Sequence, residues 1–185
     1  DDPSTAAIAA RVLDEVAPSL EAGLRQVRGN AWVMSADSLE KTRAIRQPIE
    51  HGGDVYNAFD GITYVKGAAV LRMMEAWSGP DAFRDGVRAY LNASAFGTAT
   101  TDDLLTALEA STGKPIRASL GTFIDQPGTP LLDVQTSCQN GKASVTLTQT
   151  RYKPAGSEAP DGTPWHVPVC MRTKANNQVG RTCVE

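Results

Sequence analysis

The chain has 185 residues, of which 41% are hydrophobic and 21% charged, a balance typical of a protein that folds around a core and atypical of a disordered one. Its formal net charge is −3 and the two signs are mixed along the chain, so the sequence lacks the basic stripe that a nucleic-acid partner requires. No apolar run approaches the roughly 18 residues of a membrane span.

The chain begins without an initiator Met, and its first residues are unlike a signal peptide, so we expect it to be cut from a longer polypeptide. From Ser4 to Gln126 apolar residues recur every three or four positions, which predicts helices. Pro18 divides the first two helices, because proline breaks a helix, and it leaves Ser19 as the N-cap of the second. The apolar positions are Ile8, Val12 and Val16 in the first helix and Leu20, Leu24 and Val27 in the second.

A third helix is predicted from Asp60 to Trp77, where apolar residues occur on nearly all sides and favour a buried position. Gly79 and Pro80 end this helix, and Pro80 also begins the next one. The apolar stripe of that next helix consists of Phe83, Val87, Tyr90 and Leu91.

The last two predicted helices have clear ends. Thr101 is the predicted N-cap of the first, two aspartates complement the dipole in its first turn, and Gly113 ends it. Pro115 opens the second, and the Gln-Pro-Gly sequence at residues 126–128 closes it. The inward-facing residues of the first are Leu104, Leu105 and Leu108.

After Pro130 the sequence pattern changes from helical to alternating, most clearly over residues 144–149, and this pattern predicts β-strands. Helices followed by a run of strands predict an α+β fold with separate layers, and exclude an alternating α/β sheet. We place the boundary near Leu131, with a helical lobe over residues 1–130 and a strand-rich domain over residues 131–185.

Three cysteines, Cys138, Cys170 and Cys183, lie in the strand-rich part, and the odd number leaves at least one thiol without an internal partner. A two-residue hairpin turn at Asn176-Asn177, which asparagine's tolerance of positive φ permits, places Cys170 opposite Cys183. We therefore predict a disulfide between them, which favours an extracytoplasmic location, periplasmic or secreted. The alternative is a pair of neighbouring buried thiols in a cytosolic protein.

Few residues offer obvious catalytic chemistry. Neither His51 nor His166 has a second histidine one helical turn away, as zinc-binding helices have, so neither is predicted to bind a metal. The sequence contains no Gly-rich phosphate loop and no G-x-S-x-G nucleophile motif. Asp102 and Asp103 could act as an acid and a base, but their place in the first turn of a helix already explains them through the helix dipole.

One continuous segment, residues 58–74, is informative as a whole. It reads Ala-Phe-Asp-Gly-Ile-Thr-Tyr-Val-Lys-Gly-Ala-Ala-Val-Leu-Arg-Met-Met. This sequence closely resembles the F-D-x-I-x-Y-x-K-G-A-x-V-L-x-M-L signature of the gluzincin zinc aminopeptidases, the family of aminopeptidase N and puromycin-sensitive aminopeptidase. The likeness extends well beyond the Y-x-K-G core, which alone would be a weak signal.

Further blocks match the same family in the same order. Residues 123–130 resemble its W-x-x-Q-x-G-x-P exit, with Phe123 in place of tryptophan. Residues 147–152 and 165–169 resemble two strands of its β-sandwich domain, which end in Q-x-R-F and read W-x-I-P-V. Upstream, residues 34–49 resemble more loosely the stretch that follows the third zinc ligand.

The resemblance implies a role for Tyr64. In this family the tyrosine of Y-x-K-G is similar to an oxyanion donor, because its hydroxyl hydrogen-bonds the tetrahedral intermediate. Lys66 shares the motif and either orients a carboxylate or reaches solvent, and we assign it no catalytic role. Gly67 is expected to permit close helix packing. Phe59 lies where some relatives carry a second tyrosine, and can offer at most an apolar wall.

The chain also departs from the family, whose H-E-x-x-H motif, glutamate ligand and G-x-M-E-N element would all precede residue 1. The resemblance thus implies that Zn²⁺ belongs to a longer parent, and that this chain alone binds no metal and is inactive. Residues 1–130 would form the helical lobe of a thermolysin-like catalytic domain, followed by part of a β-sandwich. The implied partners are peptide substrates and the preceding part of the same polypeptide.

Two alternatives remain open on the sequence alone. The first is a catalytically silent relative with the same fold that serves as a scaffold for protein binding. The second is an unrelated helical interaction module with an appended β domain, in which Tyr64 would face a packed core.

Overall fold

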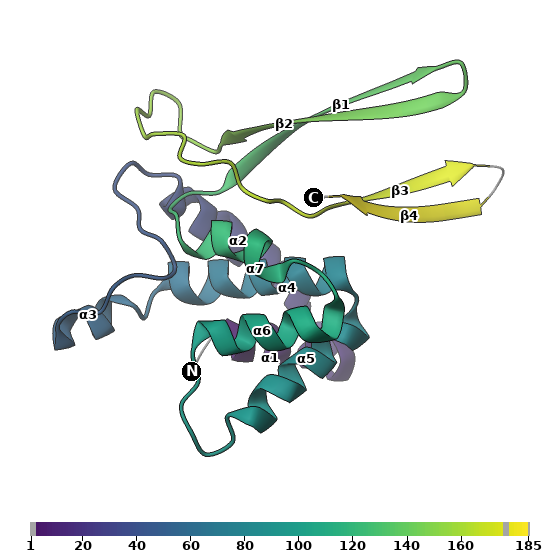
Figure 1. The fold of residues 1–185 in the computed structure, drawn as a ribbon. Coiled ribbons are helices and arrows are strands. Elements are labelled where there is room, and N and C mark those ends of the chain that lie inside the picture. Colours follow the sequence, from purple (N-terminus) through teal and green to yellow (C-terminus); the bar gives the residue numbers. More distant parts are fainter. Residues whose placement is uncertain (1–2, 176–177, 185) are drawn as a thin grey trace.

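The computed structural model describes residues 3–175 and 178–184, in which a group of helices is followed by two β-hairpins (Figure 1). The elements are α1 (Pro3–Val16), η1 (Pro18–Leu20), α2 (Ala22–Asp37), α3 (Gly52–Asn57), η2 (Ile62–Lys66), α4 (Gly67–Ser78), α5 (Pro80–Ala93), α6 (Thr101–Thr112), α7 (Ile116–Ile124), β1 (Pro130–Gln139), β2 (Lys142–Arg151), β3 (Val169–Ala175) and β4 (Gln178–Val184). The predicted α+β class is confirmed. None of the helices in these residues is long and apolar enough to cross a membrane.

The break between the first two helices lies at Pro18, as predicted, but its geometry differs from the prediction. Pro18 opens the 3₁₀ turn η1, and Glu21 follows it with a φ of 48° before α2 begins. Ser19 lies inside that turn, so its prediction as the N-cap of the second helix is wrong. The turn wins because the fixed φ of proline suits the first position of a helical turn.

The predicted third helix is interrupted by a π turn. The chain enters the turn at Ile62 and leaves it at Lys66, and the regular helix α4 continues from Gly67 to Ser78. The apolar spacing correctly predicted burial, because Val70, Met74 and Trp77 are buried. It could not show the π turn, because a helix that is apolar on nearly all sides has no narrow stripe whose phase an inserted residue would shift.

The core of the helical part lies between α4, α6 and α7, where Met74, Leu105, Leu108 and Ile116 are almost fully buried. Trp165, which follows β2, packs into the same cluster. Within the stripe predicted for α5, Phe83 and Val87 pack against this core, whereas Leu91 is exposed. The prediction for Leu91 is therefore wrong.

Helix α6 begins one residue earlier than predicted. Thr100, not Thr101, is the N-cap, and its hydroxyl accepts a hydrogen bond from the Asp103 backbone N–H at 3.3 Å. The Asp103 carboxylate accepts hydrogen bonds in return from the Thr100 backbone N–H at 2.8 Å and hydroxyl at 2.7 Å. These bonds lower the pKa of Asp103 below its usual value. Asp102 also has a structural role, because it pairs with Arg117 at 2.6 Å.

We expect Asp103→Ala to destabilise the chain at neutral pH, and the difference from wild type to shrink in acid. The folded-state pKa of Asp103 lies below the ordinary aspartate value of 3.8, so its stabilisation is present above that pH. It is lost as the pH falls through the depressed folded value. Urea unfolding of both chains at several pH values measures this, and a constant difference at all pH values would contradict the assignment.

The strand-rich part forms two separate antiparallel pairs, β1 with β2 and β3 with β4. Figure 1 shows both hairpins extending on the same side of the helices. The strand expected at residues 165–169 is mostly absent, since β3 begins at Val169. The Gln149 side chain explains this, because it accepts from the Trp165 N–H at 2.6 Å and donates to the Trp165 carbonyl at 2.9 Å, which occupies both backbone groups.

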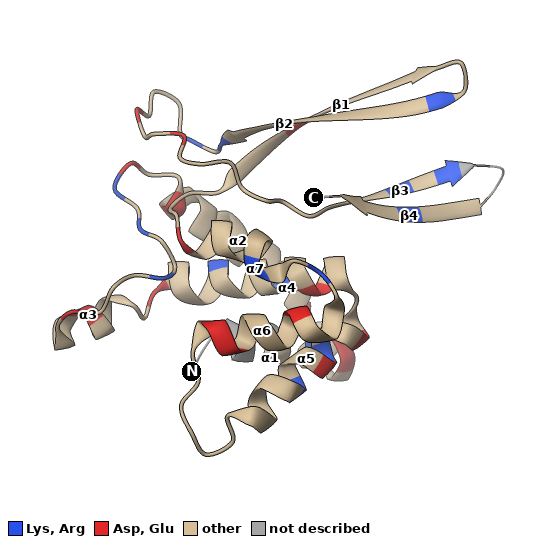
Figure 2. Cartoon of the chain, in the orientation of Figure 1, with Lys and Arg blue, Asp and Glu red and all other residues tan. Residues whose placement is uncertain are grey.

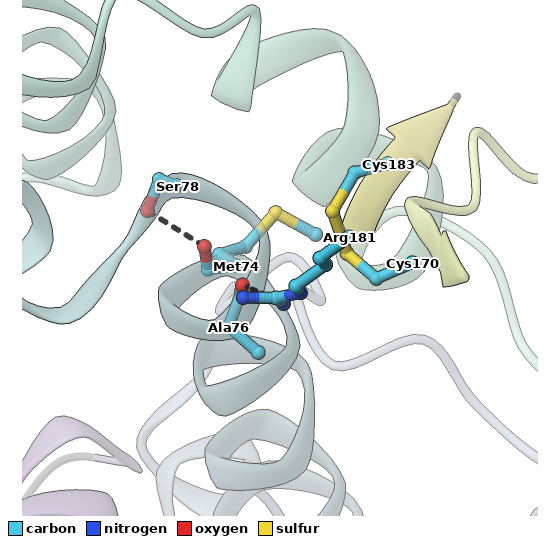
Figure 3. The surroundings of a disulfide bond; sticks show 6 residues. All are labelled: Met74, Ala76, Ser78, Cys170, Arg181 and Cys183. Carbon is cyan, nitrogen blue, oxygen red and sulfur yellow. Dashed lines mark hydrogen bonds between the residues drawn. A yellow bond between two sulfur atoms is a disulfide. The ribbon is translucent and has the colours of Figure 1, made fainter. Parts of the chain in front are cut away.

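The predicted disulfide is present between Cys170 and Cys183, which lie opposite each other in the β3–β4 register. The turn expected at Asn176-Asn177 falls outside the described residues. Figure 3 shows Arg181 of the same hairpin reaching α4, where it donates to the Ala76 carbonyl at 2.5 Å. Cys138 is a free, exposed thiol.

Reduction of the Cys170–Cys183 bond should raise the intact mass of the chain by two hydrogens and lower its free energy of unfolding by about 3 kcal/mol. The stability loss is that of a cross-link that closes a loop with a sequence separation of 13 residues. Mass spectrometry and denaturant unfolding, with and without reductant, measure both effects. Cys138→Ser is the matched control, because it should change neither result, and an unchanged mass on reduction would contradict the bond.

Candidate functional site

Tyr64 occupies the middle of the π turn Ile62–Lys66 and is half-buried. Its backbone N–H donates to the Asp60 carbonyl at 3.1 Å, and its ring lies 6.1 Å from the ring of Phe59. Single π turns inside helices occur often at functional sites. The structure thus places the predicted tyrosine in a locally unusual segment and leaves part of its side chain accessible.

The chain just before Tyr64 is held by a group of polar contacts. The Asp60 carboxylate accepts from the Thr63 backbone N–H at 3.1 Å and from Arg43 Nη2 at 2.5 Å. Arg43 Nη2 also donates to the Thr63 hydroxyl at 2.9 Å. The loop that follows α2 therefore supports the residues on the N-terminal side of Tyr64.

Lys66 holds the C-terminal end of the π turn. The residue is only 5% exposed, and its Nζ lies 2.8 Å from Oδ2 of Asp37, which is fully buried at the end of α2. Nζ also donates to the Gly128 carbonyl at 2.9 Å. Burial lowers the pKa of Lys66, and the carboxylate of Asp37 opposes this effect. Of the two roles expected for Lys66, orienting a carboxylate is thus the one observed.

Asp37 gathers donors from several segments of the chain. Besides Lys66, its carboxylate accepts from the Gly128 N–H at 2.9 Å, the Thr129 hydroxyl at 3.0 Å and the Thr42 hydroxyl at 3.1 Å. These contacts match the capacity of an ionised carboxylate, which has about four acceptor positions. The pair Asp37–Lys66 is therefore well satisfied in spite of its burial. This pair could not be predicted from the sequence, because its two residues are distant in the chain and neither forms part of a recognisable ligand pattern.

The loop before β1, which contacts the Asp37–Lys66 pair, is also in contact with Arg151. Arg151 at the end of β2 is buried, and it donates to the Pro160 carbonyl at 2.8 Å and the Leu39 carbonyl at 3.3 Å. Gly128 has a φ of 92°, and a Cβ there would lie 2.6 Å from Arg151 Nε. The glycine of the exit motif is thus required both by its backbone conformation and by the close approach of Arg151.

A cavity of about 400 Å³ lies beside the π turn, with Thr63 and Gly67 in its wall. Its lining is mainly apolar and includes Val70, Leu120 and Ile124. Thr63, rather than Tyr64, contributes to this wall. The cavity therefore adjoins the helix that carries Tyr64 without being formed by that side chain.

Two large apolar side chains are exposed near the π turn. Trp32 is 64% exposed, and Phe59, whose ring contacts that of Tyr64, is 59% exposed. Trp32 also lies against Gly61, where a Cβ would come within 2.5 Å of its ring. Val16 and Val27, which belong to the apolar spacing that predicted the first two helices, are exposed as well.

The residues that the structure describes include no group of three or more His, Cys, Asp and Glu side chains that could hold a metal ion. His51 precedes α3 and its side chain is 83% exposed, 3.7 Å from Asp54. His166 follows β2, where its backbone N–H donates to the Thr122 hydroxyl at 3.1 Å. Within the part of the chain that the structure describes, the side chains therefore do not fit a zinc site. Figure 2 shows acidic and basic residues on the same elements, in line with the mixed charge of the sequence.

Comparison with known proteins gives a consistent result. Residues 4–124 match the sequence model of the peptidase family M1 domain. The chain is 33% identical over 151 residues to the mitochondrial aminopeptidase 2 of Saccharomyces cerevisiae, an alignment that covers 82% of this chain and 16% of the yeast protein.

Two further relatives come from an archaeon and a snake. The tricorn protease-interacting factor F2 of Thermoplasma acidophilum is 32% identical over 155 residues, covering 84% of this chain and 19% of that protein. The aminopeptidase A of Gloydius brevicauda is 35% identical over 143 residues, covering 74% of this chain and 14% of that protein. The chain thus spans less than a fifth of the length of each of these relatives.

Proposed function

Because the chain belongs to peptidase family M1, we propose that it is one part of a zinc metalloaminopeptidase that removes amino-terminal residues from peptides. The observation that carries the proposal is the setting of Tyr64. It lies in a π turn whose two ends are held by Arg43 and by the Asp37–Lys66 pair, and its side chain is only half-buried. Such a setting suits a group that must meet a reacting atom in a fixed position.

The chemical role that we assign to Tyr64 is hydrogen-bond donation to the oxyanion of the tetrahedral intermediate. A phenol suits this role because it keeps its proton at neutral pH. A donor fixed at the site of developing charge stabilises the transition state by about 3 to 4 kcal/mol, which equals about 100- to 1,000-fold in rate. Because Arg43 and the Asp37–Lys66 pair hold the two ends of the π turn, little reorganisation is needed when the charge develops.

We assign the zinc to residues outside this chain. The described residues do not fit a zinc site, and Tyr64 is the one residue here to which we give a catalytic role. The exposed apolar residues Trp32, which lies against Gly61, and Phe59, which contacts the Tyr64 ring, support a contact with another part of the same polypeptide. In this proposal residues 1–130 belong to the catalytic domain and residues 131–185 to a following β domain.

The disulfide supports a location outside the cytoplasm for the strand-rich part. Bonds of this kind persist in oxidising compartments and are rare where thiols are kept reduced. Labelling of thiols in intact cells expressing the complete polypeptide tests this. We expect Cys170 and Cys183 to react only after reduction, and labelling of both without reductant would contradict it.

Hydrolysis of aminoacyl p-nitroanilides tests the proposed function. The complete polypeptide should release nitroaniline, lose this activity after treatment with a chelator, and recover it when Zn²⁺ is added. The 185-residue chain alone should neither bind stoichiometric zinc nor hydrolyse the substrate. A complete polypeptide that is inactive with zinc, on a panel of amino-terminal residues, would instead indicate a binding scaffold with the same fold.

A further inference from the structure

We propose that Lys66 is a positioning residue for the reaction, which orients Tyr64 through its buried ion pair with Asp37. This inference rests on the proposed function, because it takes Tyr64 as the group that meets the reacting atoms. Neither Lys66 nor Asp37 would touch the substrate. Their effect would pass through the helix that carries Tyr64.

Lys66 and Tyr64 point to nearly opposite sides of the π turn. Residues two apart in a helical turn point to nearly opposite sides of the helix. Lys66 follows Tyr64 by two positions in the π turn and points into the protein, where its Nζ meets Asp37 at 2.8 Å. Fixing Lys66 on the inner side therefore fixes the rotation of the turn about its axis, and with it the side to which Tyr64 points.

The buried ion pair between Lys66 and Asp37 sets the rotation of the turn firmly. Lys66 is 5% exposed and Asp37 is not exposed at all. If the turn rotated, the Lys66 ammonium and the Asp37 carboxylate would lose each other, and breaking a buried ion pair costs several kcal/mol. A buried ion pair adds little stability compared with apolar packing, but it does penalise every other arrangement. The pair is thus better suited to specify one orientation than to stabilise the fold.

The same ion pair also fixes the turn to other segments of the chain. Asp37 lies at the end of α2, and both members of the pair also bind the backbone of Gly128, through its carbonyl at 2.9 Å and its N–H at 2.9 Å. The Thr129 hydroxyl adds a bond to Asp37 at 3.0 Å. The turn that carries Tyr64 is therefore joined to two segments at once, α2 and the loop before β1.

A double-mutant cycle in the complete polypeptide tests the inference, with Tyr64→Phe, Lys66→Met and the two combined. Misplacement of a reacting group by about 1 Å costs up to about 100-fold, so we expect Lys66→Met alone to lower kcat by about 10- to 100-fold with little change in KM. In the Tyr64→Phe background, where no hydroxyl is left to position, Lys66→Met should cause almost no further loss. Losses that multiply would overturn the inference, since a general structural defect would act in both backgrounds.

The result separates the inference from the proposed function. If Tyr64→Phe alone retains wild-type kcat, the proposed function fails. If Tyr64→Phe is impaired and Lys66→Met is not, only the positioning role fails. Lys41→Met, which removes an exposed lysine, is the matched control and should leave kcat unchanged.

Thr129→Val keeps the inference testable if Lys66→Met does not fold. This variant removes one hydrogen bond to Asp37 and leaves the ion pair in place. The same cycle with Tyr64→Phe should show a several-fold loss of kcat in the wild-type background and none in the Tyr64→Phe background. An unchanged kcat in Thr129→Val would then count against the inference.

Discussion

Tyr64→Phe is expected to lower kcat of the complete polypeptide by about 100- to 1,000-fold, with KM for a small aminoacyl substrate changed by no more than about twofold. The substitution removes one hydroxyl and keeps the ring, so the contact with Phe59 at 6.1 Å is retained. A hydrogen bond to an oxyanion exists only after the carbonyl has been attacked. Its loss therefore affects the chemical step and leaves substrate binding almost unchanged.

Steady-state kinetics on the wild type and the variant measure this effect. Tyr152→Phe is the matched control, because it removes a hydroxyl from a tyrosine that follows β2 and has no assigned role in the site. Its kcat should equal that of the wild type. A Tyr64→Phe variant with a raised KM and an unchanged kcat would place the hydroxyl in ground-state binding and would refute the assigned role.

Asp37→Ala is expected to lower the free energy of unfolding of the chain by about 3 to 5 kcal/mol, because it leaves the buried ammonium of Lys66 without its counter-charge. It also leaves the Gly128 N–H and the Thr129 hydroxyl without their acceptor. This is the largest loss of stability that we expect from a single substitution in the chain. Denaturant unfolding followed by circular dichroism measures it.

The double variant Asp37→Asn, Lys66→Met is the companion measurement. It removes both charges together, and it keeps an amide whose oxygen can accept from the Gly128 N–H while its NH2 group donates to the Thr129 hydroxyl. We expect it to be more stable than Asp37→Ala, because no unpaired charge is left buried. Asp85→Ala, which alters an exposed surface pair with Arg88, should cost less than about 1 kcal/mol and serves as the control. An Asp37→Ala variant as stable as that control would show that the buried pair does not contribute to the free energy of unfolding.

Much of the helical part could be predicted from local signals. Pro80, Gly113 and Pro115 mark helix boundaries that the structure confirms, because each residue restricts or frees the backbone in its own position. The N-cap of α6 was misplaced by one residue, since Thr100 and Thr101 are chemically alike and only the hydrogen bond to Asp103 distinguishes them.

In the strand-rich part, local signals were sufficient only where a short turn sets the register of two strands. Cys170 and Cys183 could be paired because a hairpin relates them by a simple count. The segment around Trp165 could not, because its backbone is held by the side chain of Gln149 and its ring by the helical core. A side-chain amide that replaces a neighbouring strand leaves no periodic pattern in the sequence.

In the candidate site as well, some residues could be predicted from the sequence and others could not. Tyr64 was found through its motif, and its catalytic role remains a prediction. Asp37 was missed altogether, because a buried carboxylate reveals itself only through partners such as Lys66 and Gly128, which are distant in the sequence. The exposure of Val16 and Val27 could not be predicted either, because apolar spacing indicates a helix with an apolar face and does not show what covers that face.

The most direct test of the central claim is the affinity of a phosphinic dipeptide analogue, whose tetrahedral phosphorus resembles the intermediate, for the complete polypeptide and its Tyr64→Phe variant. If the Tyr64 hydroxyl binds the oxyanion, the inhibition constant should rise by about the same factor as kcat/KM falls, about 100- to 1,000-fold, while KM stays nearly constant. Equal affinity of the analogue for both proteins would contradict the account, because a group that stabilises the transition state must also bind its mimic.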